Sequence, residues 1–80
     1  MTLNQAVSKR IRELLKEKNM TQYRLEQNSG VSHGTMNSFL NGRYNACNLK
    51  TVVLIIRALG MTISEFFNSS LFDDDILDID

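Results

Sequence analysis

Apolar residues recur at helical spacing along most of the chain, and no proline interrupts them. The first predicted helix runs from about Asn4 to Lys18, and Asn19 is expected to end it. One face of this helix is apolar and the others are charged, which is typical of a helix packed on a core. The apolar face consists of Val7, Ile11, Leu14 and Leu15.

Two short helices are predicted next. Thr21 is expected to cap the first of them, because its hydroxyl can accept from an early backbone N–H. That helix ends at Ser29-Gly30, where glycine adopts a left-handed conformation without steric cost. Ser32 caps the following helix, which Asn41-Gly42 stops.

Two more helices complete the predicted fold. Asn48 is expected to cap a fourth helix through Leu59. Thr62 and Glu65 have the spacing of a capping box, which opens a fifth short helix. The predicted fold class is therefore all-α, a compact five-helix bundle.

Charge is divided unevenly, although the net charge is zero. Residues 1–72 hold all nine Lys and Arg against four Glu, whereas residues 73–80 hold five Asp, so the two parts carry +5 and −5. A basic body favours a polyanionic partner. We expect a domain over residues 1–68 and an acidic C-terminal tail over residues 69–80.

The acidic tail has more than one possible role. It can compete with phosphate for the basic surface, repel a duplex, or only aid solubility. Ile76, Leu77 and Ile79 are interleaved with the aspartates and would instead allow docking on the body or on a partner subunit.

Length and composition exclude several classes. The 80 residues suit one domain, and 42% apolar with 22% charged residues is typical of a soluble globular protein. One cysteine cannot form a disulfide within the chain. No apolar stretch is long enough to span a membrane. Charged residues interrupt the first twenty positions, where a signal peptide needs an uninterrupted apolar stretch. We therefore predict a cytoplasmic protein that does not enter a membrane.

No set of residues has the spacing of a catalytic or metal site. His33 and Cys47 are the only histidine and the only cysteine, which leaves too few ligands for zinc and no oriented nucleophile. The carboxylates of residues 73–75 are consecutive and point different ways on a regular backbone. We expect no enzyme activity, no metal and no cofactor.

Residues 21–41 have the pattern of a helix-turn-helix. Two short helices meet at Gly30, with Leu25 on the first and Met36 and Phe39 on the inner side of the second. The outer side of the second helix is uncharged and rich in hydrogen-bonding and small residues, which suits base edges in a major groove. These residues are His33, Gly34, Thr35, Asn37, Ser38 and Asn41.

The chain contains an ordered set of short motifs, namely Thr21-Gln22-x-x-Leu25, Ser29-Gly30-Val31-Ser32, Thr35-Met36, Asn41-Gly42, Leu49-Lys50-Thr51-Val52, Ala58-Leu59-Gly60 and Thr62-x-Ser64-Glu65-Phe66. This set resembles the Cro/repressor-type, XRE-like helix-turn-helix DNA-binding domain. The resemblance covers roughly residues 7–67. It implies a bundle that binds double-stranded operator DNA, usually as a homodimer, with its third helix in the major groove.

The resemblance also implies roles for single residues. The expected base contacts are His33, Gly34, Asn37 and Ser38, and the expected phosphate contacts are Gln22, Thr35, Asn41 and Arg43. The predicted function is sequence-specific DNA binding by a small transcriptional regulator, a repressor that acts by occupying its site. The alternative is an antitoxin-like or adaptor protein that uses the same fold to bind another protein.

The chain departs from the family pattern at three positions. Glu26 stands where a small alanine is usual, so its carboxylate must reach solvent or a partner. Leu15 and Leu40 stand where the family often has an arginine and a glutamate that pair. Two apolar groups avoid the desolvation penalty of a buried ion pair, so we expect these leucines to touch.

The predicted fourth helix is apolar on nearly every side, so it needs cover on two sides. We expect Leu54, with Phe67, Leu71 and Phe72, to line a homodimer interface. In the alternative, Leu71 and Phe72 of the same chain fold back over this surface.

Overall fold

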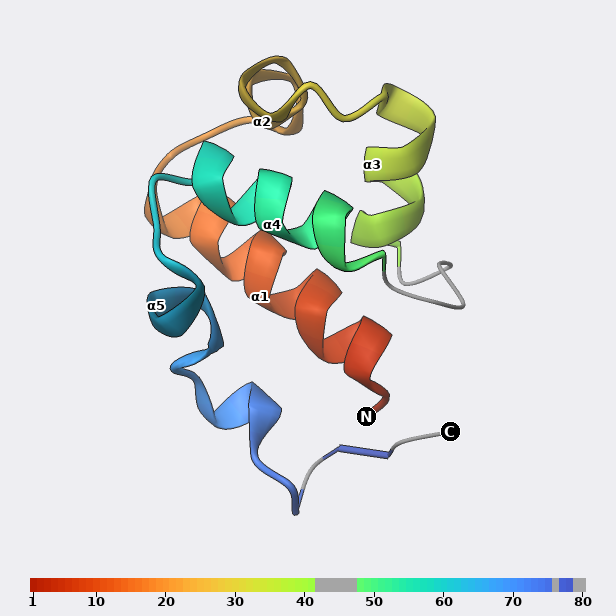
Figure 1. Ribbon diagram of the computed structural model, residues 1–80, viewed down its shortest axis with the longest axis vertical. Coiled ribbons are helices and arrows are strands. Elements are labelled where there is room, and N and C mark those ends of the chain that lie inside the picture. The colour runs from red at the N-terminus through yellow and green to blue at the C-terminus, as the bar shows by residue number, and fades with distance from the viewer. Residues whose placement is uncertain (42–47, 76, 79–80) are drawn as a thin grey trace.

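Five α-helices and one 3₁₀ turn make up the described part of the chain (Figure 1). The structure is a computed structural model that describes residues 1–41, 48–75, 77 and 78. The predicted all-α five-helix fold is confirmed, with boundaries within about two residues of those expected. The elements are α1 Leu3–Glu17, α2 Gln22–Ser29, α3 His33–Leu40, α4 Leu49–Ala58, α5 Ile63–Phe67 and the 3₁₀ turn η1 Ser70–Phe72.

Local hydrogen bonds at the helix ends explain these boundaries. The predicted caps are confirmed, since Thr21, Ser32, Asn48 and Thr62 each accept from a backbone N–H in the first turn of the helix that follows. Gly30 ends α2 in the left-handed region, with φ 74°. α1 begins at Leu3 rather than Asn4 because Thr2 and Gln5 form a capping box that was not predicted.

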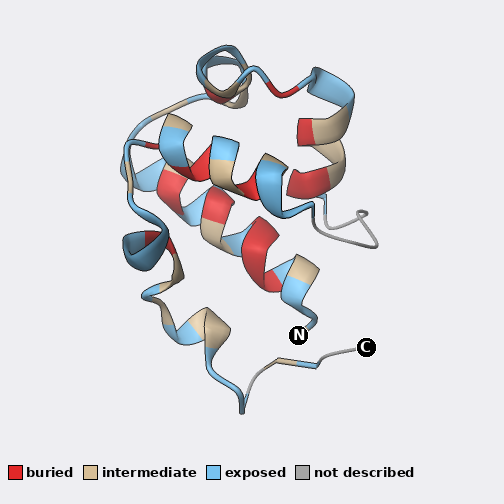
Figure 2. Ribbon diagram, viewed as in Figure 1, coloured by how far each residue is buried: buried red, intermediate tan, exposed pale blue. Residues whose placement is uncertain are grey.

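The helices pack around one core, to which every helix contributes a fully buried side chain. α3 packs against α1 and α2, α4 packs against α2 and α5, and η1 packs against α1. α2 and α3 lie at one end of the molecule and α5 and η1 at the other (Figure 1), and the buried positions lie on the inner sides of the helices (Figure 2). The largest fully buried side chains are Ile11, Leu25, Met36, Ile55, Ile56 and Phe66.

Arg10 joins the first helix to the last. Its Nε donates to the carbonyl of Phe66 at 2.8 Å, and its Nη2 donates to the carbonyl of Glu65 at 3.0 Å. The guanidinium also lies over the Phe66 ring, 5.9 Å from the centroid. A five-residue helix is too short to be stable alone, so these contacts and the burial of Phe66 hold α5 in place.

The segment after α5 returns to the body of the domain. Phe72 in η1 is half-buried, with its ring 4.8 Å from that of Phe67 and 6.0 Å from that of Phe66. Further along, the backbone N–H of Asp78 donates to the carbonyl of Met1 at 2.7 Å. Ile76 and Ile79 lie outside the described residues, and a domain boundary after residue 68 stays a prediction. None of the described helices is long and apolar enough to cross a membrane.

Candidate nucleic-acid interface

α2 and α3 form a helix-turn-helix unit whose inner side is buried. Leu25, Met36 and Phe39 belong to the core, as predicted, and Val31 in the turn joins them. This packing turns the other side of α3 outward. His33, Gly34 and Asn41 are exposed there, whereas the predicted contact residues between them are half-buried, namely Thr35, Asn37 and Ser38.

Several polar groups of α3 are engaged within the helix. The Ser38 hydroxyl donates to the carbonyl of Gly34 at 3.1 Å, which leaves its oxygen able to accept. The Asn41 amide donates to the carbonyl of Asn37 at 2.8 Å. The side-chain amide of Asn37 itself has no hydrogen-bond partner within the described residues. It therefore keeps both a donor and an acceptor for a ligand.

Glu26 joins the N-terminal ends of α2 and α3. Its Oε2 accepts from Gln22 Nε2 at 2.8 Å and lies 2.8 Å from His33 Nδ1. The pKa of the Glu26 carboxyl lies below its ordinary value, first because Gln22 donates to it and then because of the hydrogen bond and charge of His33, while burial opposes the shift. The expectation that this carboxylate reaches solvent or a partner is confirmed, and the partners are two predicted DNA contacts.

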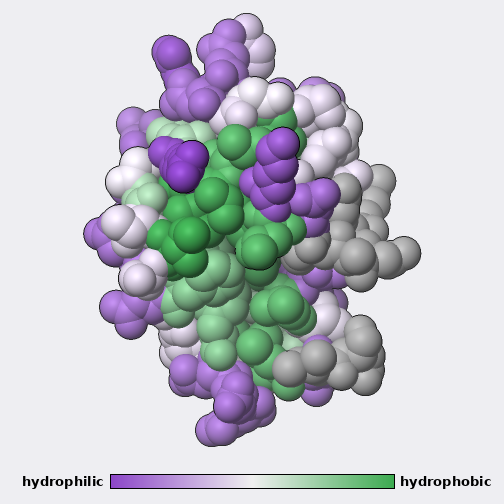
Figure 3. Space-filling model, in the orientation of Figure 1, coloured by the Kyte–Doolittle hydropathy of each residue, from purple (hydrophilic) through white to green (hydrophobic). Residues whose placement is uncertain are grey.

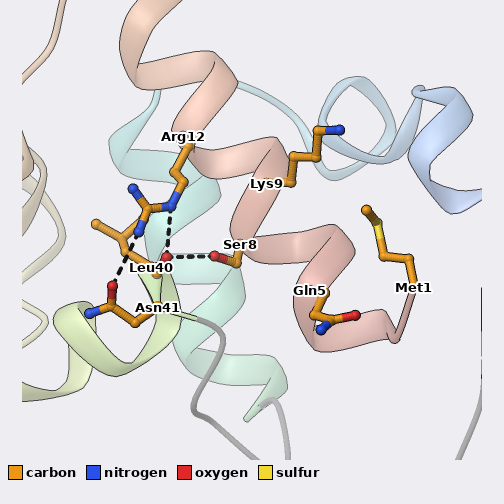
Figure 4. A pocket seen from close by; sticks show the side chains of 7 residues that line it. All are labelled: Met1, Gln5, Ser8, Lys9, Arg12, Leu40 and Asn41. Carbon is orange, nitrogen blue, oxygen red and sulfur yellow. Dashed lines mark hydrogen bonds between the residues drawn. The ribbon is translucent and has the colours of Figure 1, made fainter.

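The C-terminal end of α3 is held by α1. The Ser8 hydroxyl and Arg12 Nε both donate to the carbonyl of Leu40, at 2.8 and 2.7 Å, and Arg12 Nη2 donates to Asn41 Oδ1 at 3.3 Å (Figure 4). These bonds were not predicted. Leu40 is buried in the core, and Leu15 is half-buried against that core. Apolar side chains suit these two positions, where the family often has an ion pair. A direct contact between the two leucines stays a prediction.

A shallow pocket of about 380 Å³ lies beside this anchor, between α1 and the end of α3. Most of its polar atoms are already bonded within the protein, and the Lys9 side chain points away from Arg12 and Leu40 (Figure 4). The pocket therefore presents few free groups for a ligand. Its lining residues are Met1, Gln5, Ser8, Lys9, Arg12, Leu40 and Asn41.

The predicted dimer residues do not share one environment. Leu54 is exposed on α4, and an apolar area covers the centre of the face on which α4 lies (Figure 3). Phe67, Leu71 and Phe72 are half-buried, and both phenylalanines pack against the core of their own chain. A dimer interface at Leu54 stays a prediction.

Other candidate residues contribute little to a site. Arg43 and Cys47 lie outside the described residues. Where the structure describes the chain, no three His, Cys, Asp or Glu side chains gather in a way that could hold a metal ion.

α2 and α3 are joined by a turn at Gly30, and α3 exposes a polar side. This arrangement is that of a helix-turn-helix DNA-binding domain. The chain belongs to the Cro/C1-type HTH DNA-binding domain family, which it matches over residues 10–69. The resemblance seen in the sequence is thereby confirmed. No curated protein and no solved structure matches the chain significantly.

Proposed function

We propose that this protein is a sequence-specific transcriptional regulator, a repressor that occupies an operator with α3 in the major groove. One observation carries the proposal beyond the family's general DNA binding. α3 turns an uncharged, hydrogen-bonding side outward while other helices fix both of its ends. A reading helix held at both ends loses little conformational entropy on binding, which favours specific contacts.

The proposed DNA contacts are assigned from the position of each residue on the helix-turn-helix unit. His33, Gly34, Asn37 and Ser38 would face base edges, and Gln22, Thr35, Asn41 and Arg43 would contact the phosphate backbone. Asn37 and Ser38 are half-buried and still suit this role, because an α-helix that lies in the major groove brings its own surface close to the base edges. The ends of α3 flank these positions with polar groups that suit phosphate oxygens.

We further propose that the regulator acts as a homodimer, with exposed Leu54 of α4 in the interface. An isolated large apolar side chain on the surface is ordinary. Leu54 is exposed on α4, and the face on which α4 lies has an apolar area at its centre that a second copy of the same surface would cover (Figure 3). A dimer would place two α3 helices on a near-palindromic site.

Selection of bound sequences from a random duplex pool tests the function. Enrichment of one near-palindromic site supports a specific regulator. Binding should also weaken as salt rises, by about 0.9 log units per log unit of salt for each phosphate neutralised. Bound pools without a shared sequence would contradict sequence-specific regulation. Complete failure to bind duplex DNA would favour an adaptor that binds another protein.

A further inference from the structure

Glu26 lies between two side chains for which we propose DNA contacts. Only 12% of its side chain is exposed, whereas 76% of the His33 side chain is exposed. A carboxylate at this place brings a negative charge close to the DNA, so a role in general affinity is a poor explanation for it. Its two short hydrogen bonds instead indicate a role in orienting Gln22 and His33.

We propose that Glu26 is a positioning residue that determines base specificity, because it fixes the proton of His33 on Nδ1 and leaves Nε2 to face the DNA. The inference rests on the proposed function. Protonation of the ring then changes which kind of base His33 selects.

The position of the proton follows from the chemistry of the pair. An ionised carboxylate can only accept hydrogen bonds, so the ring nitrogen 2.8 Å from Glu26 Oε2 must carry the proton. The lowered pKa of Glu26 keeps it ionised at neutral and mildly acidic pH. In a neutral imidazole one nitrogen donates and the other accepts, so Nε2 of neutral His33 is an acceptor.

Each charge state of His33 fits a different class of base. As an acceptor, Nε2 can accept a hydrogen bond from the exocyclic amine of adenine or cytosine. In the protonated ring Nε2 becomes a donor, and its partners are then O6 and N7 of guanine, O4 of thymine and N7 of adenine, whereas cytosine offers it no acceptor.

No other charged group competes for this pair within the described ranges. α3 carries no further charged residue, and α1 faces α3 with Arg12, which is bonded to Leu40 at the opposite end of the helix. α4 packs against α2. No ion pair links Glu26 or His33 to the other titratable groups on these two helices. Those groups are Tyr23, Arg24, Lys50 and Arg57.

Base preference at two pH values tests the proposal on the full chain. Duplexes selected as above are varied at each position and titrated at about pH 5.5 and about pH 8. At one position per half-site, acid should raise the affinity for guanine or thymine relative to cytosine by about threefold to tenfold, whereas adenine, which presents both a donor and an acceptor, discriminates less. If the wild-type protein binds DNA at both pH values with the same base preferences, the proposal is overturned and the proposed function stands.

Three variants separate positioning from simple folding. Glu26→Gln should still bind DNA but show a weaker pH effect, because an amide can donate or accept and no longer fixes the proton. His33→Gln should bind with pH-independent preferences. Gln27→Ala is the matched control and should keep the wild-type pH effect. Gln27 is exposed on α2, and among the described residues its side chain bonds only Tyr23. A full pH effect in Glu26→Gln would overturn the role of Glu26.

A measurement without DNA gives a second, independent readout. The chain has one histidine, so ¹⁵N chemical shifts of the imidazole need no assignment. At about pH 8 the free protein should show the proton on Nδ1, and Glu26→Gln should lose that preference. A ring protonated on Nε2 in the wild-type protein would overturn the proposal, whatever the protein binds.

Discussion

Arg12 donates to the backbone carbonyl of Leu40 at 2.7 Å, so a side chain of α1 closes the C-terminal end of α3. Ser8 gives the same carbonyl a second donor at 2.8 Å. Ser8→Ala and Arg12→Ala should each lower the free energy of unfolding by about 1 kcal/mol, because one donor remains. The free energy of unfolding of the double variant should fall by more than the sum of the two single losses, since the Leu40 carbonyl then has no side-chain donor.

Urea denaturation of the four proteins in this cycle measures the effect. Glu13→Ala, on the exposed side of α1, is the control and should change stability by less than about 0.5 kcal/mol. Strictly additive losses would show that the two donors do not share the carbonyl in solution.

Gly34 offers a test that separates DNA contact from stability. A Cβ added there meets no heavy atom within 4 Å, and Gly34 lies on the exposed side of α3. Gly34→Ala should therefore raise the free energy of unfolding by about 0.5–1 kcal/mol through helix propensity. It should also weaken specific DNA binding by about tenfold, equivalent to about 1.4 kcal/mol, because the methyl group stands between the helix and the bases.

Thermal unfolding and duplex titration of the same sample check both effects. Unchanged affinity for the selected duplex would remove Gly34 from the base-contact set.

Asn37 should specify one base. Its side-chain amide has no partner within the described residues, and asparagine can pair bidentately with adenine, which discriminates by about 1–3 kcal/mol. Asn37→Ala should relax the preference at one position per half-site while the fold survives. A binding-site matrix for both proteins measures this, and identical matrices would exclude Asn37 as a reader.

Leu54→Lys tests the proposed homodimer. A charge in an apolar interface is costly to desolvate, so the variant should sediment as a folded monomer while the wild-type protein sediments as a dimer. Leu3→Lys is the matched control, because Leu3 is also an exposed apolar residue but lies at the start of α1. A wild-type protein that is monomeric at high concentration contradicts the proposal.

Glu65 should make the domain sensitive to acid. The backbone N–H of Thr62 and then its side chain hold the pKa of Glu65 below its ordinary value, so folding favours the ionised form. The stability from this group is present above the unfolded pKa and is lost as the pH falls through the folded one, between about pH 5 and pH 3.

Glu65→Gln retains a capping amide but cannot titrate, so its melting temperature should fall less than that of the wild-type protein over this pH range. Glu13→Gln controls for the general effect of removing a carboxylate. Parallel melting curves for wild type and Glu65→Gln would contradict the role of the capping box.

Features set by neighbouring residues could be predicted from the sequence. The caps at Thr21 and Ser32 and the left-handed Gly30 depend on chemistry within a few positions, and all three are confirmed. Their order along the chain was enough to indicate a helix-turn-helix.

Contacts between distant residues could not be predicted in the same way. Glu26 and His33 are seven positions apart and meet only because of the angle between α2 and α3. The family pattern directed attention to Leu15 and Leu40, yet the polar link between α1 and α3 comes from Arg12 and uses a backbone carbonyl rather than a carboxylate. A single sequence does not indicate which carbonyl a long side chain will reach.

The bonds from Arg10 to the carbonyls of α5 have a consequence for synthesis of the chain. They join positions 55 and 56 residues apart, so they form only after the last helix has left the ribosome. α2 and α3 are synthesised before α5, so the site for Phe66 in the shared core is still open when they leave the ribosome. The nascent protein therefore passes through a stage with an uncovered apolar surface, and chaperones that bind such surfaces have that interval in which to act.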